Sequence, residues 1–283
     1  MRYLIKRNLM LFFRDKANVF FSMLSVLIII GLYAFFLGDM MVRNFSNLPG
    51  AEFLANTWIM AGILTVTPVT TTLGALGIMI EDKVKIVRDF QASPLKRSSL
   101  AISYISSAFA ISMILTLITL VLAEAYIVIK GGELLSILNL IKVLGLIVFA
   151  TVSSSFMMFF TASYFKTVNS FGVASTVLGT MIGFLTGMYI PIGVLPSPIQ
   201  TIIKIFPPSH TGLLFRRVMM EQAEKISFAG VPQEAFENFR LEMGVMYKFG
   251  DFDLTPAMSI IYLSAITAIF FALSVWKISK KQK

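Results

Sequence analysis

Six long apolar stretches constrain this chain more than any other feature of its sequence. A helix that crosses a bilayer needs about 20 consecutive, mostly apolar residues. The stretches of about this length are Val19 to Leu37, Thr57 to Ile80, Ala101 to Ile129, Leu140 to Tyr164, Phe171 to Ile190 and Pro256 to Trp276. Charged residues make up only 14% of the chain, whereas a typical soluble domain has about 25%. The sequence therefore predicts an all-α membrane protein with six transmembrane helices, organised as one transmembrane domain over residues 1–283.

The positions of lysine and arginine predict which side of the membrane each loop faces, because cytoplasmic loops retain an excess of these residues. If the N-terminus is inside, fifteen of the 24 basic residues lie in cytoplasmic segments, and the two short outer loops contain only Arg43 and Lys130. We therefore expect both termini in the cytoplasm. The charge of +9 fits this topology better than nucleic-acid binding, because the basic residues flank apolar stretches instead of forming one patch with aromatic residues.

Several kinds of site are excluded or disfavoured by what the sequence lacks. The absence of cysteine excludes disulfides, thiolate metal sites and cysteine nucleophiles, and a single histidine, His210, argues against a histidine-based metal centre. The sequence has no G-x-x-x-x-G-K-[ST] phosphate loop, no H-E-x-x-H and no G-x-S-x-G. We therefore expect no bound metal and no cofactor, and if this protein does energised work, the energy enters elsewhere.

Residues 1–18 precede the first apolar stretch and are predicted to form an amphipathic elbow helix. Apolar residues recur on one side of this helix and basic or polar residues gather on the other: Ile5, Leu9 and Phe12 against Arg7, Arg14 and Asn18. A helix with this pattern lies along the membrane surface, with its arginines near anionic headgroups. The alternative is a tail whose charges only set the topology.

Residues 81–97, between the second and third stretches, form the most densely charged segment of the chain. A helical wheel separates an apolar arc from a charged arc: Ile86, Val87 and Phe90 against Glu81, Lys85, Arg88 and Asp89. Ser93 and Pro94 then have the pattern of an N-cap and first turn of the next helix. Such a helix suits docking on a soluble partner, and the alternative is a solvated loop whose charges fix the topology. Periodicity alone leaves both interpretations open.

The fifth stretch contains a repeated small-x-x-x-small pattern at Gly179, Gly183 and Gly187. Glycines at this spacing let two helices approach closely. The pattern predicts helix packing, either at a subunit interface or within one chain.

Residues 188–255 separate the fifth stretch from the last one and contain apolar pieces that are too short to span a membrane. Five prolines between positions 191 and 208 interrupt these pieces. We expect a re-entrant or interfacial segment, which is tolerated at membrane depth only where protein or water satisfies its backbone; an apolar external loop is the alternative. From Pro232, the run PQEAFENFRLEMGVMYKF predicts one amphipathic external helix.

Glu124 is an acidic residue inside the third apolar stretch. Intramembrane acids are functional candidates by default, which makes Glu124 a candidate for the translocation path. Its position near the predicted outer boundary allows a second interpretation, in which the carboxylate reaches the headgroup region.

The whole arrangement resembles the permease subunits of ABC type-two transporters, which export drugs, lipids, polysaccharides or peptides. The likeness covers nearly the full chain: the basic elbow, six apolar stretches, the charged segment after the second, and GMYIPIGVLPSPIQ…FPPSHTGLLFRR before the last. The charged segment carries the most specific part of the pattern, at Glu81, Phe90, Ser93, Pro94, Lys96 and Arg97. One departure is that Lys85 stands where the family often has glycine.

The resemblance implies that residues 81–97 form a coupling helix that docks on a separate ABC ATPase subunit, which uses ATP and magnesium. The residues it assigns to this coupling are Glu81, Asp82, Val84, Ile86, Val87, Arg88 and Phe90. It also implies a second permease subunit in a homodimer or heterodimer, contact with membrane lipids, and location in a bacterial cytoplasmic membrane. The expected cargo is an amphipathic or hydrophobic molecule, such as a drug, antibiotic, lipid or glycan. It enters between the first and fifth spans.

Two other classes remain as alternatives. An ion-coupled secondary transporter needs polar residues at mid-membrane, for which the stretches offer Glu124 and hydroxyls such as Thr65, Thr67, Thr70 and Ser153. A lipid-modifying membrane enzyme needs clustered acids, histidines or a metal, and the acids near residue 82 form only a sparse cluster. The chain itself is therefore expected not to be an enzyme.

Overall fold

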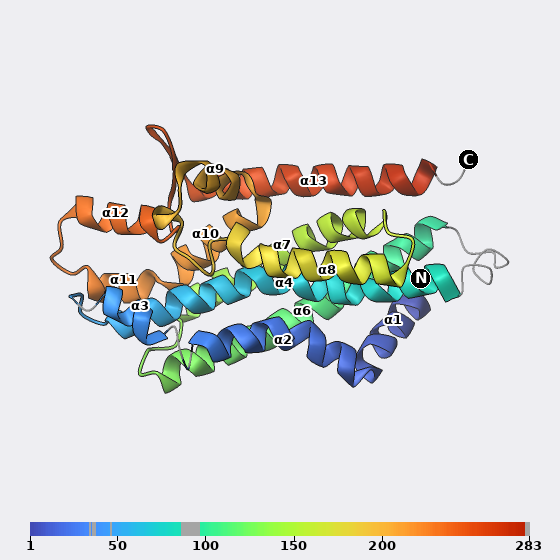
Figure 1. Ribbon diagram of the computed structural model, residues 1–283, viewed down its shortest axis with the longest axis horizontal. Coiled ribbons are helices and arrows are strands. Elements are labelled where there is room, and N and C mark those ends of the chain that lie inside the picture. The colour runs from blue at the N-terminus through green and yellow to red at the C-terminus, as the bar shows by residue number, and fades with distance from the viewer. Residues whose placement is uncertain (34, 36–37, 46, 86–96, 281–283) are drawn as a thin grey trace.

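The structure, a computed structural model, describes residues 1–283 except 34, 36–37, 46, 86–96 and 281–283. The long helices run roughly parallel to the longest axis of an elongated bundle (Figure 1). Its helices are α1 (Arg2–Arg14), α2 (Lys16–Leu32), α3 (Gly38–Asn44), α4 (Ala51–Lys85), α6 (Arg97–Ile129), α7 (Ile137–Ala162), α8 (Val168–Leu185), α9 (Ser197–Ile205), α10 (Pro207–Met219), α11 (Glu221–Ser227), α12 (Gln233–Glu242) and α13 (Pro256–Lys280). A short 3-10 helix, η2 (Ile192–Val194), precedes α9, and strands β1 (Tyr247–Phe249) and β2 (Phe252–Leu254) form an antiparallel hairpin before α13.

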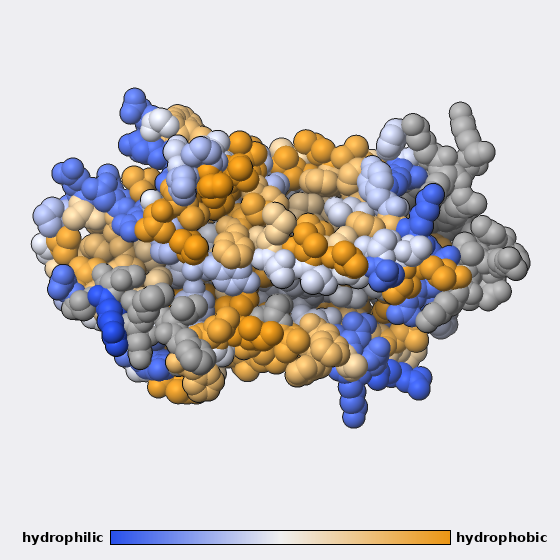
Figure 2. All heavy atoms as spheres, in the orientation of Figure 1, coloured by the Kyte–Doolittle hydropathy of each residue, from blue (hydrophilic) through white to orange (hydrophobic). Residues whose placement is uncertain are grey.

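Different elements lie at the two ends of the bundle, which we call the terminal end and the cap end. At the terminal end, on the right of Figure 1, α1 begins and α4 and α13 end. At the cap end, on the left, lie α3, α11 and α12. Figure 2 shows hydrophobic side chains over the middle of the visible face and hydrophilic ones gathered toward both ends, as expected for a protein that crosses a membrane along its long axis.

Within the described residues, five helices are long and apolar enough to cross a membrane. They are Ala51–Val84, Ser98–Ile129, Ile137–Ala162, Val168–Leu185 and Pro256–Lys277. The first predicted span corresponds to α2, which is described as a helix only as far as Leu32, close to residues outside the described ranges. The prediction of a helical membrane protein is confirmed, and the count of six spans stays a prediction.

Helix α4 is the central element of the bundle. It packs against α2, α6, α7, α8 and α10, and side chains all around it, such as Leu54, Ile63 and Leu76, are fully buried. A helix that is apolar on every side is expected in the middle of a bundle. By contrast, α8 and α13 expose large apolar side chains, among them Phe184 and Ile261. The bundle is therefore built around α4, with α8 and α13 at its periphery.

A proline interrupts the middle of α4. Pro68 lacks the N–H that would continue the helical hydrogen-bond ladder. From α6, Ser112 Oγ donates to Pro68 O at 3.1 Å and lies 2.8 Å from Thr71 Oγ1. The hydroxyl of Ser112 therefore forms hydrogen bonds with α4 next to the proline that interrupts its backbone ladder.

The predicted elbow of residues 1–18 consists of two helices rather than one. Helix α1 ends at Arg14, and Asp15 caps the next helix by accepting a hydrogen bond from Asn18 N at 3.0 Å. This is the usual use of an aspartate at a helix start. The chain therefore turns at Asp15, and the first apolar stretch begins a helix three residues earlier than predicted.

Residues 188–255 form several short elements, and one prediction for them is wrong. The single helix expected from Pro232 to Phe249 ends at Glu242. Gly244 follows with a φ of +68°, a conformation that favours glycine and ends a helix. Beyond it Tyr247 pairs with Leu254 across the hairpin. The charge pattern located the start of α12 but missed this turn.

Candidate functional site

Three helices meet at a buried carboxylate at the terminal end. Arg7 of α1 donates to Asp82 of α4 through both terminal nitrogens, Nη1 to Oδ2 at 2.7 Å and Nη2 to Oδ1 at 2.9 Å. Tyr104 of α6 donates its hydroxyl to the same Asp82 Oδ2 at 2.6 Å. Bidentate contacts between guanidinium and carboxylate fix orientation as well as position. We call Arg7, Asp82 and Tyr104 the terminal junction.

A second polar contact extends the terminal junction along α1. Asn8 Nδ2 donates to Ser107 Oγ of α6 at 3.2 Å, and both side chains are buried. One helical turn further, Phe12 is fully buried in the protein. Helix α1 is therefore attached to the bundle by specific contacts. Arg7, which was predicted to lie near headgroups, is partly exposed and pairs with Asp82 of α4.

The terminal junction lies at the root of the predicted coupling segment. Asp82 is only 5% exposed, while Glu81 and Val84 beside it are exposed. The remaining coupling residues of the prediction, Ile86, Val87, Arg88 and Phe90, lie outside the described residues. The hydrogen bond to Asp82 raises the pKa of Arg7, which keeps the guanidinium charged. An ion pair thus joins α1 to the last turn of α4, where the segment departs.

A different arginine is buried at the cap end. Arg216 of α10 is 1% exposed, and its Nη2 donates to Gly187 O at 2.8 Å and Thr186 O at 3.1 Å. These two carbonyls follow the last residue of α8, so the cation lies at the negative end of that helix. The guanidinium also lies over the Trp58 ring of α4, 5.2 Å from its centroid. We call this set of contacts the cap clamp.

Among the residues that the structure describes, no carboxylate forms an ion pair with Arg216 in the cap clamp. Burial lowers the pKa of Arg216, and its Nε is buried without a hydrogen-bond partner in the described part of the chain. Space for the guanidinium comes from glycine: a Cβ at Gly244 would lie 3.0 Å from Arg216 Nη1, and one at Gly212 would lie 3.7 Å from it. The buried charge of Arg216 is thus accommodated by two carbonyl oxygens, by the face of an aromatic ring, and by glycines that leave room for the guanidinium.

Other contacts attach the cap to the bundle. Trp58 Nε1 donates to Met243 O, after α12, at 2.8 Å. Arg240 of α12 pairs with Glu224 of α11 at 2.5 Å, and Glu224 is 2% exposed. Desolvation raises the pKa of Glu224 despite this cation. The segment predicted as re-entrant or external is therefore fixed to α4 and α8 at several points.

The three predicted packing glycines occupy different environments. Gly179 has open space where a Cβ would lie, and the ring of Tyr189 lies against Gly183. Gly187 lies beyond the end of α8, with a φ of +62°, and accepts a hydrogen bond from Arg216. Their shared role in packing between helices stays a prediction.

Glu124 is held near the loop that follows α6. Its Oε2 accepts a hydrogen bond from Leu135 N at 3.0 Å, and its Oε1 is buried without a partner in the described part of the chain. The proposed role of Glu124 in a translocation path therefore remains a prediction, beside a visible role in fastening this loop.

Sequence reasoning missed both the terminal junction and the cap clamp, for different reasons. Arg7 and Asp82 are 75 positions apart, so no local pattern links them. Arg216 follows Leu213, Leu214 and Phe215, and a charge that adjoins an apolar run is a usable signal of burial. Among the described residues, no group of three or more His, Cys, Asp and Glu side chains is placed to hold a metal ion. The terminal junction and the cap clamp thus fasten helices to one another.

Comparison with known families agrees with this architecture. A model of the family described as ABC-2 family transporter protein matches residues 51–276, from the first residue of α4 into the last turns of α13. No curated protein matches the chain. The match covers well over half of the sequence, and helices long enough to span a membrane lie within it or at its end. The chain therefore belongs to the ABC-2 transporter family, as a permease subunit.

Proposed function

We propose that this permease exports an amphipathic or hydrophobic molecule and that a separate ATPase subunit drives it by docking on residues 81–97. The terminal junction is the observation that carries this proposal. Arg7, Asp82 and Tyr104 link three helices at the place where the segment leaves α4. A structure meant only to expose charge at a loop needs no such bracing.

The junction suggests how force reaches the bundle. A docked ATPase that displaces the segment moves the end of α4 and the start of α6, because the segment connects these two helices. The Arg7–Asp82 ion pair carries α1 with them. Since α4 packs against α2, α7, α8 and α10, a displacement of α4 is transmitted to each of these helices.

The peripheral helices support the proposed cargo and a second permease subunit. Along α8, Val173, Val177 and Phe184 are exposed at helical spacing. An apolar face of this kind contacts lipid, an apolar cargo or another subunit. Both α2 and α8 pack on α4, so a cargo that enters beside them reaches the element to which force is applied.

The test reconstitutes the permease with a candidate phosphate-loop ABC ATPase and measures complex formation, ATPase activity and transport into inverted vesicles. Glu81→Lys and Phe90→Asp are expected to reduce binding of the ATPase, because they change the predicted docking face. Arg7→Gln is expected to preserve binding and to lower transport per ATP hydrolysed by about tenfold, because the junction that carries the displacement is lost.

Arg14→Gln serves as the matched control, because Arg14 is an exposed arginine on the same helix. This variant is expected to bind and transport normally. The proposal is overturned if complexes with Glu81→Lys and Phe90→Asp form as well as the wild-type complex. Transport driven by an ion gradient without any ATPase would instead identify a secondary transporter.

A further inference from the structure

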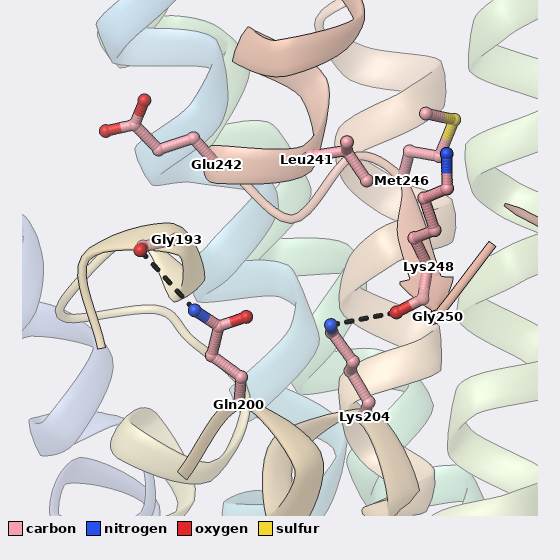
Figure 3. Close-up of a pocket in the computed structure, with 8 residues that line it drawn as sticks. All are labelled: Gly193, Gln200, Lys204, Leu241, Glu242, Met246, Lys248 and Gly250. Carbon is pink, nitrogen blue, oxygen red and sulfur yellow. Dashed lines mark hydrogen bonds between the residues drawn. The ribbon is translucent and has the colours of Figure 1, made fainter. Parts of the chain in front are cut away.

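A cavity of about 440 Å³ opens at the cap end between η2 and α9 on one side and the end of α12 and β1 on the other. Figure 3 shows Gln200 and Lys204 of α9 directed into this space from below, with Leu241 and Met246 across from them. The cavity is therefore bounded by two polar side chains on a helix and by apolar side chains opposite. Lys248 and Glu242 also line it, and Figure 3 shows the carboxylate of Glu242 directed away from Lys204. None of the contacts in the terminal junction or the cap clamp involves these residues.

Lys204 supplies the positive charge of the cavity. Its Nζ donates to Lys248 O at 2.9 Å and lies 5.8 Å from the centre of the Phe249 ring. An ammonium group has three N–H donors, so two remain after the bond to Lys248. Among the described residues, no carboxylate forms an ion pair with Lys204, and burial lowers its pKa. An anion in the cavity would offset this desolvation.

Lys248 differs from Lys204 although both line the cavity. Its Nζ lies 3.5 Å from Asp253 Oδ1 across the hairpin. Figure 3 shows the Lys248 side chain extending away from Lys204. The cavity thus has one ammonium group available to a ligand, and Lys248 provides a natural control.

Gln200 adds an oriented acceptor. Its Nε2 donates to Leu195 O at 2.9 Å and to Gly193 O at 3.4 Å, so the amide orientation is fixed. Figure 3 shows its oxygen on the side toward Lys204. A carbonyl oxygen accepts from a hydroxyl. The pair therefore suits a ligand that carries an anionic oxygen and a hydroxyl close together.

The opposite side of α9 indicates where the cavity lies relative to the membrane. Ile199, Ile202 and Ile205 recur at three-residue spacing and are 43%, 53% and 57% exposed. A helix with an apolar face and a polar face lies in the membrane interface, with its lysine directed to the headgroup region. The cavity on the polar side of α9 is then at the depth of lipid phosphates.

We propose that this cavity binds the headgroup of an anionic phospholipid of the phosphatidylglycerol type. Lys204 contacts the phosphate, Gln200 accepts a hydrogen bond from a headgroup hydroxyl, and Leu241 and Met246 contact the apolar part of the lipid near its glycerol backbone. The ligand occupies the cap from its lateral side. This binding is independent of the ATPase partner and of the direction of transport.

The test measures binding of spin-labelled phosphatidylglycerol and phosphatidylcholine to the purified full chain in detergent. Wild type is expected to prefer phosphatidylglycerol. Lys204→Gln is expected to weaken its binding about fivefold, as the loss of one lysine near a lipid phosphate predicts, while Lys204→Arg retains it. Lys248→Gln is the matched control and is expected to bind as wild type does.

A second variant distinguishes a loss of lipid binding from a change in the structure of the hairpin. Lys204→Gln also removes the bond to Lys248 O and weakens the hairpin if Lys204 serves only as a brace. Gln200→Glu leaves that bond in place and is expected to reduce phosphatidylglycerol binding by repelling the phosphate. Equal binding of the two lipids by wild type, or wild-type binding by both variants, overturns the proposal.

Soluble sn-glycerol 1-phosphate and inorganic phosphate distinguish a lipid from a free anion. In the proposed site neither displaces the spin-labelled lipid at micromolar concentrations, because each lacks the apolar contacts. Displacement by either compound at concentrations below those of the lipid would assign the cavity to a soluble phosphate and overturn the lipid proposal.

Discussion

Two arginines of this permease, one partly exposed and one buried, accommodate their charges in opposite ways. Arg7, at the terminal end, faces the carboxylate of Asp82, and this contact raises its pKa. Arg216, at the cap end, donates to the carbonyls of Thr186 and Gly187, and burial lowers its pKa. A charge that is neutralised by another charge requires two side chains to meet, whereas a charge held by carbonyls requires only that the backbone keep its path.

These two ways of holding a charge predict which end of the bundle tolerates movement. An ion pair at a partly exposed surface survives small shifts, because each side chain follows the other, and water reaches Arg7 if the pair separates. The cap clamp has no such alternative, because Arg216 has no water to replace Thr186 and Gly187. We therefore expect the terminal end to move during transport while α8, α10 and Trp58 keep their relation.

The largest effect is expected from Arg216→Met. It leaves the carbonyls of Thr186 and Gly187 buried without their donor and removes the stacking on Trp58, so the free energy of unfolding should fall by about 3 kcal/mol. Equilibrium unfolding in detergent mixed with SDS, followed by tryptophan fluorescence, measures this. Arg217→Met is the matched control and should lose less than half as much, because Arg217 remains partly exposed. Equal losses in the two variants would contradict the cap clamp.

A smaller loss is expected at the terminal junction. Arg7→Gln and Asp82→Asn should each reduce the free energy of unfolding by about 2 kcal/mol, because each leaves a charged partner poorly satisfied. The double variant should lose less than the sum, with a coupling energy of about 1 kcal/mol. Additive losses in this cycle would show that the two side chains do not stabilise one another.

Substitution of two glycines by alanine distinguishes the cost of backbone strain from the cost of crowding against Arg216. Gly244 and Gly250 both have positive φ, at +68° and +58°, but only Gly244 adjoins the guanidinium. Gly250→Ala should cost about 1 kcal/mol from strain alone, and Gly244→Ala about 1 kcal/mol more. The same unfolding measurement applies. A smaller cost at Gly244 than at Gly250 would mean that Arg216 moves aside freely.

The smallest effect is a dependence on pH at the edge of the cap. The hydrogen bond from Lys225 lowers the pKa of Glu221 below its ordinary value of 4.5. Because the folded pKa is depressed, this carboxylate stabilises the fold above pH 4.5, and the stabilisation disappears as pH falls through the lowered pKa. Glu221→Gln should therefore lower the melting temperature by about 1 °C at pH 7 and leave it unchanged near pH 3. A difference that grows toward low pH would reverse this sign.

The sequence predicted the helices of the bundle well, because their apolar length is a local property. Five of the six stretches correspond to helices long enough to span a membrane, with boundaries that differ by a few residues. The hairpin after α12 was missed because the helical pattern continues past Gly244, and only the tertiary structure shows that this glycine turns the chain. Contacts between distant positions, such as Arg7 with Asp82, leave no trace in a single sequence.

The proline in α4 acquires a meaning from the two arginines. Toward the cap end, Trp58 is stacked under Arg216 and bonded to Met243 O, and toward the terminal end Asp82 is bound by Arg7. A helix that is held at both ends and lacks a backbone hydrogen bond at Pro68 bends there more readily than it shifts along its axis. We therefore expect a displacement of the terminal end to bend α4 near Pro68, opposite Ser112, instead of shifting the whole helix along its axis.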